Sequence, residues 1–256
     1  PLEHPFVINM LDNREDLGNL GNSIRIAVSV KNGDIFNKAY MQTLSEITDE
    51  LFYLPGVDRS AMKSLWTPSV RWIEVTEEGF RGGAVIPDGY DGSDASLNSL
   101  RQNILKSGQV GRLVADNFKS TIVYASLFET NPETGKPLDY KQLSLELEEK
   151  IRDKYRAKNP NIDVHIIGFA KKIGDLIEGI SSILMFALIT MGLTLTFLFA
   201  YSRCFIGTIV PVLTSIIAVV WQLGILHLLG YGVDPYSVLV PFLVFAIGIS
   251  HGVQIV

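Results

Sequence analysis

Hydrophobic residues in the last third of the chain form three long, nearly uninterrupted segments. They run from about residues 177 to 200, 205 to 229 and 237 to 256. Each holds about 20 residues, the length of helix that crosses a hydrocarbon core of about 30 Å. Pro211 and Pro241 lie inside two of them, and membrane helices tolerate proline where neighbouring groups satisfy the freed carbonyl. The pattern therefore predicts three transmembrane helices that form an all-α bundle.

The preceding part of the chain alternates short apolar strands with amphipathic helices. Strands are predicted at residues 23–30, 57–66, 71–76, 120–128 and 162–168, and helices at 35–54, at 96–106 and after Asp139. Asp139 and Gln142 resemble a capping box. Residues 77–96 are expected to form a loop. The order is β-α-β, an insertion and β-α-β, which is the α+β ferredoxin-like arrangement with helices on one face of a sheet.

The charged residues divide the chain at the same place. Of the 22 Lys and Arg and 27 Asp and Glu residues, segment 173–256 contains only Asp175, Glu178, Arg203 and Asp234. A surface that faces water needs far more charge than this. We therefore expect a water-soluble domain at 1–172 and a transmembrane region at 173–256. Neither part is basic, so nucleic acid is not an expected partner.

The few charges between the apolar segments predict an orientation. Arg203 lies in the turn after the first segment, and Asp234 lies in the turn after the second. The positive-inside rule places Arg203 in the cytoplasm, with Asp234 and the N-terminal domain outside. The chain begins without Met and ends within an apolar run, so we expect it to be a piece of a longer membrane protein.

The third apolar segment carries a glycine-rich stretch, AIGISHGVQ, at residues 246–254. Together with an extracytoplasmic ferredoxin-like domain that leads directly into closely spaced spans, it resembles the resistance–nodulation–division (RND) transporters, in particular their MMPL-type branch. The resemblance implies that 1–172 is the first periplasmic porter domain and that the three segments are spans two to four. It also implies a bacterial inner-membrane protein, a missing second half and a homo-oligomer, either a dimer or a trimer. Proton-motive force would drive the export of hydrophobic or amphiphilic, lipid-like cargo.

The glycine-rich stretch departs from the family pattern at the residues that relay protons. Ser250 stands where family members carry Asp, and His251 stands where they carry Tyr or a second Asp. An ionisable residue inside a membrane is a functional candidate by default, and histidine exchanges protons near neutral pH. Gln254 lies three residues further on, on the same helix face. Ser250, His251 and Gln254 are therefore proton-relay candidates; the alternative is a neutral His251 that fixes packing or gates substrate.

Two further groups of residues are candidates for structural or substrate-contacting roles. Gly248 and Gly252 form a G-x-x-x-G motif, which lets another helix approach closely. Four aromatic residues surround the insertion: Trp66, Trp72, Phe80 and Tyr90. The resemblance implies that this face borders the substrate path, and packing in the domain core is the alternative.

The sequence gives no sign of enzymatic chemistry. We find neither a phosphate-binding glycine loop nor a Ser-His-Asp set, and Cys204 is the single cysteine. Asp88, Asp91 and Asp94 do not have EF-hand spacing. We therefore expect no enzyme, cofactor or metal. Two other functions remain open: a Patched-like protein that senses sterols or lipids, and a non-transporting assembly factor with a degenerate relay.

Overall fold

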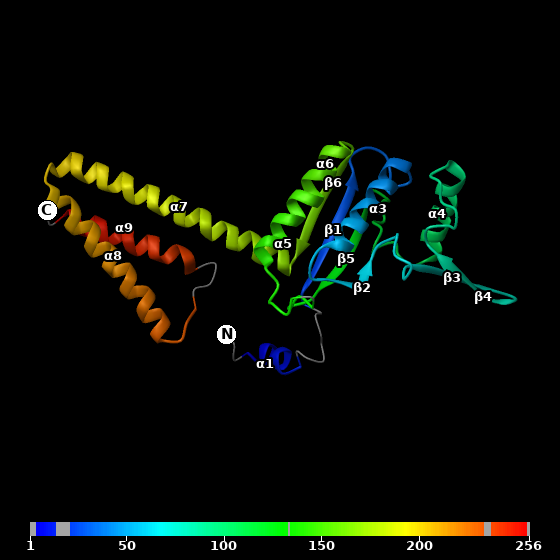
Figure 1. Cartoon of the computed structure of the whole chain (residues 1–256), viewed down its shortest axis with the longest axis horizontal. Helices are drawn as coiled ribbons and strands as arrows, with labels where there is room; N and C mark the ends of the chain where they lie inside the picture. Colours follow the sequence, from blue (N-terminus) through cyan, green and yellow to red (C-terminus); the bar gives the residue numbers. More distant parts are fainter. Residues whose placement is uncertain (1–3, 14–20, 133, 233–236, 255–256) are drawn as a thin grey trace. The chain divides into compact units, whose positions relative to one another are not determined.

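A computed structural model describes residues 4–13, 21–132, 134–232 and 237–254 of the chain (Figure 1). It divides into two compact units, Pro1–Asp175 and Leu176–Val256. Asp234, on which the predicted orientation partly depends, lies outside the described residues.

The first unit contains a four-stranded antiparallel sheet with the order β2-β5-β1-β6. Its strands are β1 (Ser23–Val30), β2 (Val57–Lys63), β5 (Ser120–Leu127) and β6 (Ile162–Gly168), all within or close to the predicted ranges. β2 ends three residues before its predicted end because Ser64 and Thr67 form a turn, in which the Thr67 amide donates to the Ser64 carbonyl at 3.0 Å.

Helices follow β1 and β5 along the chain. They are α3 (Lys38–Tyr53), α5 (Tyr140–Leu147), the π-helical turn η1 (Glu148–Asp153) and α6 (Lys154–Lys158). A short helix α1 (Pro5–Asp12) precedes the sheet. α3 begins later than predicted because Asn37 caps it, accepting a hydrogen bond from the Tyr40 amide at 2.8 Å. Asp139 caps α5 in the same way, but the Gln142 side chain bonds Glu146 and does not complete the predicted capping box.

One face of the sheet forms the core of this unit. Alternate residues of β1, of β6 and of β5 up to Ala125 are buried, while the residues between them are half-exposed or exposed. α3, α5 and α6 cover the buried face (Figure 1). Ile26 and Val123 from the sheet pack there with Leu44 and Leu51 from α3, and none of the four is exposed to solvent. The alternation that predicted the strands thus also identifies the buried face.

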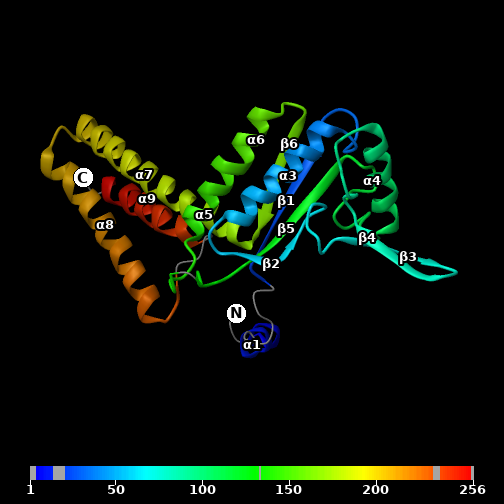
Figure 2. The ribbon, with the colours of Figure 1, turned by 45° about the vertical axis from the view of Figure 1, so that its right-hand side comes forward.

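The insertion between β2 and β5 contains a hairpin and a helix (Figure 2). The hairpin consists of β3 (Arg71–Thr76) and β4 (Gly79–Ala84), and α4 (Asp94–Lys106) follows it. The prediction of a loop at 77–96 was therefore wrong for β4 and for the start of α4. The sequence of β4, GFRGGA, lacks the alternating apolar residues that mark a strand, and its pairing with β3 determines its conformation.

The second unit is built from apolar helices. They are α7 (Phe169–Ser202), whose first turns belong to the first unit, α8 (Phe205–Leu228) and α9 (Val240–Val253), which a 3-10 turn, η2 (Ser237–Leu239), precedes. Among the described residues, α7 and α8 are long and apolar enough to cross a membrane. Within the described residues, only 6% and 17% of their most apolar windows are buried. α9 has 14 residues, fewer than the predicted third span, and residues 255 and 256 are outside the described part.

β6 passes directly into α7 at its last residue, Gly168. Gly168 has a φ of +147°, and a β-carbon there would lie 2.2 Å from the carbonyl oxygen of Ser23 on β1. Only glycine fits this position, because other residues avoid this backbone conformation and would collide with β1. α7 begins at the next residue, Phe169.

Candidate functional site

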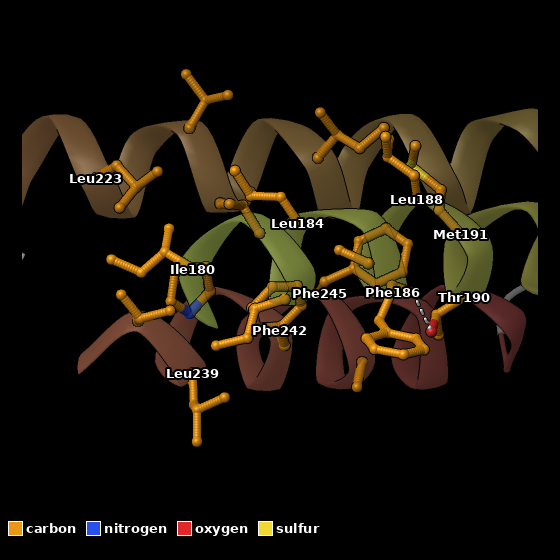
Figure 3. A pocket seen from close by; sticks show the side chains of 18 residues that line it. Ile180, Leu184, Phe186, Leu188, Thr190, Met191, Leu223, Leu239, Phe242 and Phe245 are labelled. Atoms are coloured by element: carbon orange, nitrogen blue, oxygen red, sulfur yellow. Dashed lines mark hydrogen bonds between the residues drawn. The ribbon is translucent and has the colours of Figure 1, made fainter. Parts of the chain in front are cut away.

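A cavity of about 800 Å³ lies between α7, α8 and α9 in the second unit (Figure 3). Ile180, Leu184 and Phe186 of α7 line one side of it. Phe242 and Phe245 of α9 line another side, and α8 contributes Leu223 among others. Its size is within the range of pockets that bind small molecules, about 300–1,000 Å³.

The lining of this cavity is almost entirely apolar. Among the described residues that line it, Thr190 is the one with a polar side chain. Its hydroxyl donates a hydrogen bond of 2.8 Å to the Phe186 carbonyl of its own helix, the dashed line in Figure 3. The lining therefore carries no charged side chain. Its one hydroxyl, that of Thr190, already donates its proton to the backbone of α7. Such a cavity favours hydrocarbon and disfavours groups that need hydrogen bonds.

A small buried cluster joins the three helices beside the cavity. Leu198 of α7, Val212 of α8 and Ile249 of α9 are each at most 9% exposed and pack together. Met191 and Phe245, which also line the cavity, pack against this cluster. The wall of the cavity is thus continuous with the best-packed part of the second unit.

The two glycines of the G-x-x-x-G motif lie against α8. A β-carbon on Gly248 would stand 2.6 Å from Oγ of Ser215, and one on Gly252 would stand 2.7 Å from Cβ of Pro211. Ser215 is buried, and its hydroxyl donates to the Pro211 carbonyl at 2.8 Å. The absence of side chains at both glycines allows α8 and α9 to approach this closely.

The three proton-relay candidates occupy a different side of α9. Ser250, His251 and Gln254 are all exposed, whereas Gly248 and Gly252 face α8. The two glycines therefore lie against α8, whereas the three relay candidates do not face it. Their proposed role in proton movement stays a prediction.

The four aromatic candidates do not form one cluster. Trp66 and Tyr90 pack edge to face with ring centroids 5.5 Å apart, and Trp66 Nε1 donates to the Met41 carbonyl of α3 at 3.0 Å. Both rings pack against the hydrophobic core. Trp72 instead lies beside Nζ of Lys106, 5.4 Å from the ring centroid, and Phe80 is 82% exposed on the hairpin. Trp66 and Tyr90 thus form a pair at the core, while Trp72 and Phe80 belong to the β3–β4 hairpin.

Of the three aspartates near α4, Asp91 takes part in a capping turn. The Ser93 amide donates to Oδ1 of Asp91 at 2.9 Å, and Ser93 in turn caps α4. Hydrogen bonds from the side chain and the backbone of Ser93 lower the pKa of Asp91 to about 2. Within the described ranges no group of three His, Cys, Asp or Glu side chains has the geometry of a metal site.

Sequence reasoning missed a cluster of charged residues where α7 leaves the sheet. Lys171 is 5% exposed, and its Nζ contacts Oε1 of Glu148 at 2.6 Å and Oγ of Ser144 at 3.0 Å. It also contacts Oδ1 of Asp175, one helical turn further along α7. The spacing of Lys171 and Asp175 was a visible signal for that pair. Nothing local in the sequence connects them with Ser144 and Glu148.

No protein-family model matches this chain, and no curated protein matches it.

Proposed function

We propose that the chain is part of an RND-type membrane transporter of the MMPL branch, which exports hydrophobic or lipid-like molecules. The apolar cavity between α7, α8 and α9 carries this proposal, because two of these helices are long and apolar enough to cross a membrane. A cavity with such a lining accepts an acyl chain or another hydrocarbon group.

The sheet supports the assignment of the first unit as a porter domain. Its strand order is β2-β5-β1-β6, with helices between β1 and β2 and between β5 and β6. A ferredoxin-like βαβ-βαβ domain has this order when the insertion β3-β4-α4 is set aside. The direct passage from β6 into α7 fits a domain that is attached to a membrane helix.

The proposed location is a bacterial inner membrane, with the first unit in the periplasm. Arg203 lies in the short connection between α7 and α8, which the positive-inside rule assigns to the cytoplasm. α7 and α8 would then run in opposite directions through the bilayer.

Proton-motive force is the proposed energy source, with His251 as the proton carrier. Ser250 and Gln254 share the exposed side of α9 with His251. We propose that this side contacts the remaining half of the transporter, which would supply the partner group for the proton.

Photolabelling tests whether the cavity binds hydrocarbon. The purified chain in phosphatidylcholine nanodiscs is labelled with a photoactivatable C16 fatty acid, and the labelled residues are mapped by mass spectrometry. Ala246→Trp fills the cavity and is expected to reduce labelling of Phe186 and Phe245. The matched control is Ile247→Trp, since Ile247 is the next residue, is 49% exposed and does not line the cavity. Equal labelling in both variants contradicts the proposal.

Transport itself is tested in cells that express the full-length protein. Export of a lipophilic fluorescent dye is measured with and without an uncoupler, for the native protein and for His251→Ala. Uncoupler-sensitive export that the variant loses is the expected result. Export by the native protein that is indifferent to the uncoupler rejects proton coupling, and is the outcome expected for an assembly factor.

A Patched-like sterol-binding protein is the second candidate, because the same apolar cavity suits a sterol ring system. Binding of a radiolabelled sterol to the purified chain distinguishes this candidate. Saturable sterol binding that Ala246→Trp abolishes, together with no dye export, would favour it over the transporter.

A further inference from the structure

Lys171 has a complete set of partners although it is almost fully buried. An ammonium group has three donors. Those of Lys171 go to Glu148 Oε1, Ser144 Oγ and Asp175 Oδ1. No donor is left for a ligand, and the burial leaves no approach for a substrate. The arrangement is therefore structural rather than catalytic.

The charges around Lys171 balance within the cluster. Glu148 accepts two hydrogen bonds of 2.7 Å from Arg152 Nη1 in addition to that of Lys171. Ser144 donates to Asp175 at 2.8 Å. Two carboxylates thus face two cations. A buried charge is tolerated when it is paired and hydrogen-bonded in this way, and removing one partner leaves the others uncompensated.

Close backbone packing accompanies these polar contacts. A β-carbon on Gly174 would lie 2.3 Å from Cβ of Ser144 and 2.4 Å from the carbonyl oxygen of Tyr140. Gly174 lies between Lys171 and Asp175 on α7, so α5 touches α7 where the ionic contacts are made. Glu148 opens the π-helical turn η1, and such turns often occur at functional sites.

We propose that the Lys171 cluster (Ser144, Glu148, Lys171 and Asp175) fixes the first two turns of α7 to α5 and η1, and that α7 bends beyond Asp175. The first two turns of α7 then move with the sheet domain, while the helix beyond Asp175 can change its direction. The boundary between the two compact units lies between Asp175 and Leu176. The next glycine, Gly179, has nothing within 4 Å of an added β-carbon, and glycine weakens a helix interior. The proposal does not depend on the transport function.

Hydrogen–deuterium exchange of the whole chain in detergent micelles tests the proposal. The native chain is expected to exchange more slowly at residues 171–175 than at 176–180. Lys171→Met is expected to raise exchange roughly tenfold at residues 169–178 and 144–153, because local opening then becomes easier. The matched control is Lys172→Met, since Lys172 is the adjacent lysine and is exposed. It is expected to leave exchange unchanged.

A second variant keeps the test decisive if Lys171→Met fails to fold. Asp175→Asn removes one charge with little change of shape, at a side chain that is 52% exposed. It is expected to raise exchange in the same two regions by a smaller factor, while β1 and β5 stay protected. Unchanged exchange in folded Asp175→Asn and Lys171→Met overturns the proposal. An equal effect of Lys172→Met, or faster exchange at 171–175 than at 176–180 in the native chain, overturns it as well.

Discussion

Gly252 of α9 lies against the ring of Pro211 in α8: an added β-carbon would stand 2.7 Å from Cβ of Pro211 and 3.2 Å from its Cα. The proline ring is rigid and its Cα belongs to the backbone, so neither atom can move aside by rotating a side chain. Gly252→Ala is therefore expected to separate α8 from α9 and to destabilise the second unit by about 1–3 kcal/mol. Thermal unfolding of the chain in detergent measures this.

Gly192→Ala provides the matched control for that variant. Gly192 lies in α7, and an added β-carbon there would meet nothing within 4 Å. Alanine has the higher helix propensity, so this change is expected to be neutral or slightly stabilising. Equal melting temperatures for the two variants would show that the contact between Gly252 and Pro211 does not limit packing.

Tyr40 connects α3 to two strands through its hydroxyl. The hydroxyl donates to the Val28 carbonyl at 2.7 Å and lies 2.7 Å from Oγ1 of the buried Thr121. Tyr40→Phe leaves the Thr121 hydroxyl without this partner, and we expect a loss of about 1–3 kcal/mol in the free energy of unfolding. Denaturant unfolding followed by circular dichroism measures it. Tyr53→Phe in the same helix is the control, because Tyr53 is 74% exposed and is expected to change little.

The acid titration of Asp91 provides a test of the turn before α4. Its pKa is lowered to about 2, first by the Ser93 side chain and then by the Ser93 amide, against about 3.9 for an unperturbed aspartate. Because the folded-state pKa is the lower one, the contribution to stability is present above about pH 4 and is lost as the pH falls towards 2. Carboxyl-carbon NMR is expected to show a midpoint near 2. A midpoint at the ordinary value would mean that the capping turn does not form.

Membrane insertion of α7 and α8 is tested by alkaline carbonate extraction. Both helices are long and apolar enough to cross a bilayer, and most of their side chains are exposed. The chain is expected to stay in the membrane pellet while peripheral proteins are released. Its recovery in the supernatant would contradict insertion, and with it the proposed transport.

Local patterns predicted most strands and helices because each element carries its own signal. β1 and β6 alternate apolar and polar residues, and the stripe along α3 matches its buried residues Leu44, Ile47 and Leu51. β4 has no such signal, since its glycine-rich sequence becomes a strand by pairing with β3. Strands that depend on a partner for their conformation are not visible in a pattern of single residues.

The site was harder to predict because its geometry depends on distant residues. The glycines of α9 could be recognised as a packing motif, but the sequence does not say which side of α9 His251 would occupy relative to α8. The Lys171 cluster joins residues 27 and 31 positions apart through its contacts to Ser144. Such contacts appear only once α5, η1 and α7 are placed in space.

The position of β1 between β5 and β6 determines when the sheet can be completed during synthesis. β1 pairs with β5 on one side and with β6 on the other, and both are synthesised long after it. The ribosome must therefore release residues 162–168 before the earliest strand has both neighbours, and the hydrophobic segment of α7 emerges immediately afterwards. Completion of the sheet and the appearance of the apolar helix α7 thus become nearly simultaneous events during biosynthesis.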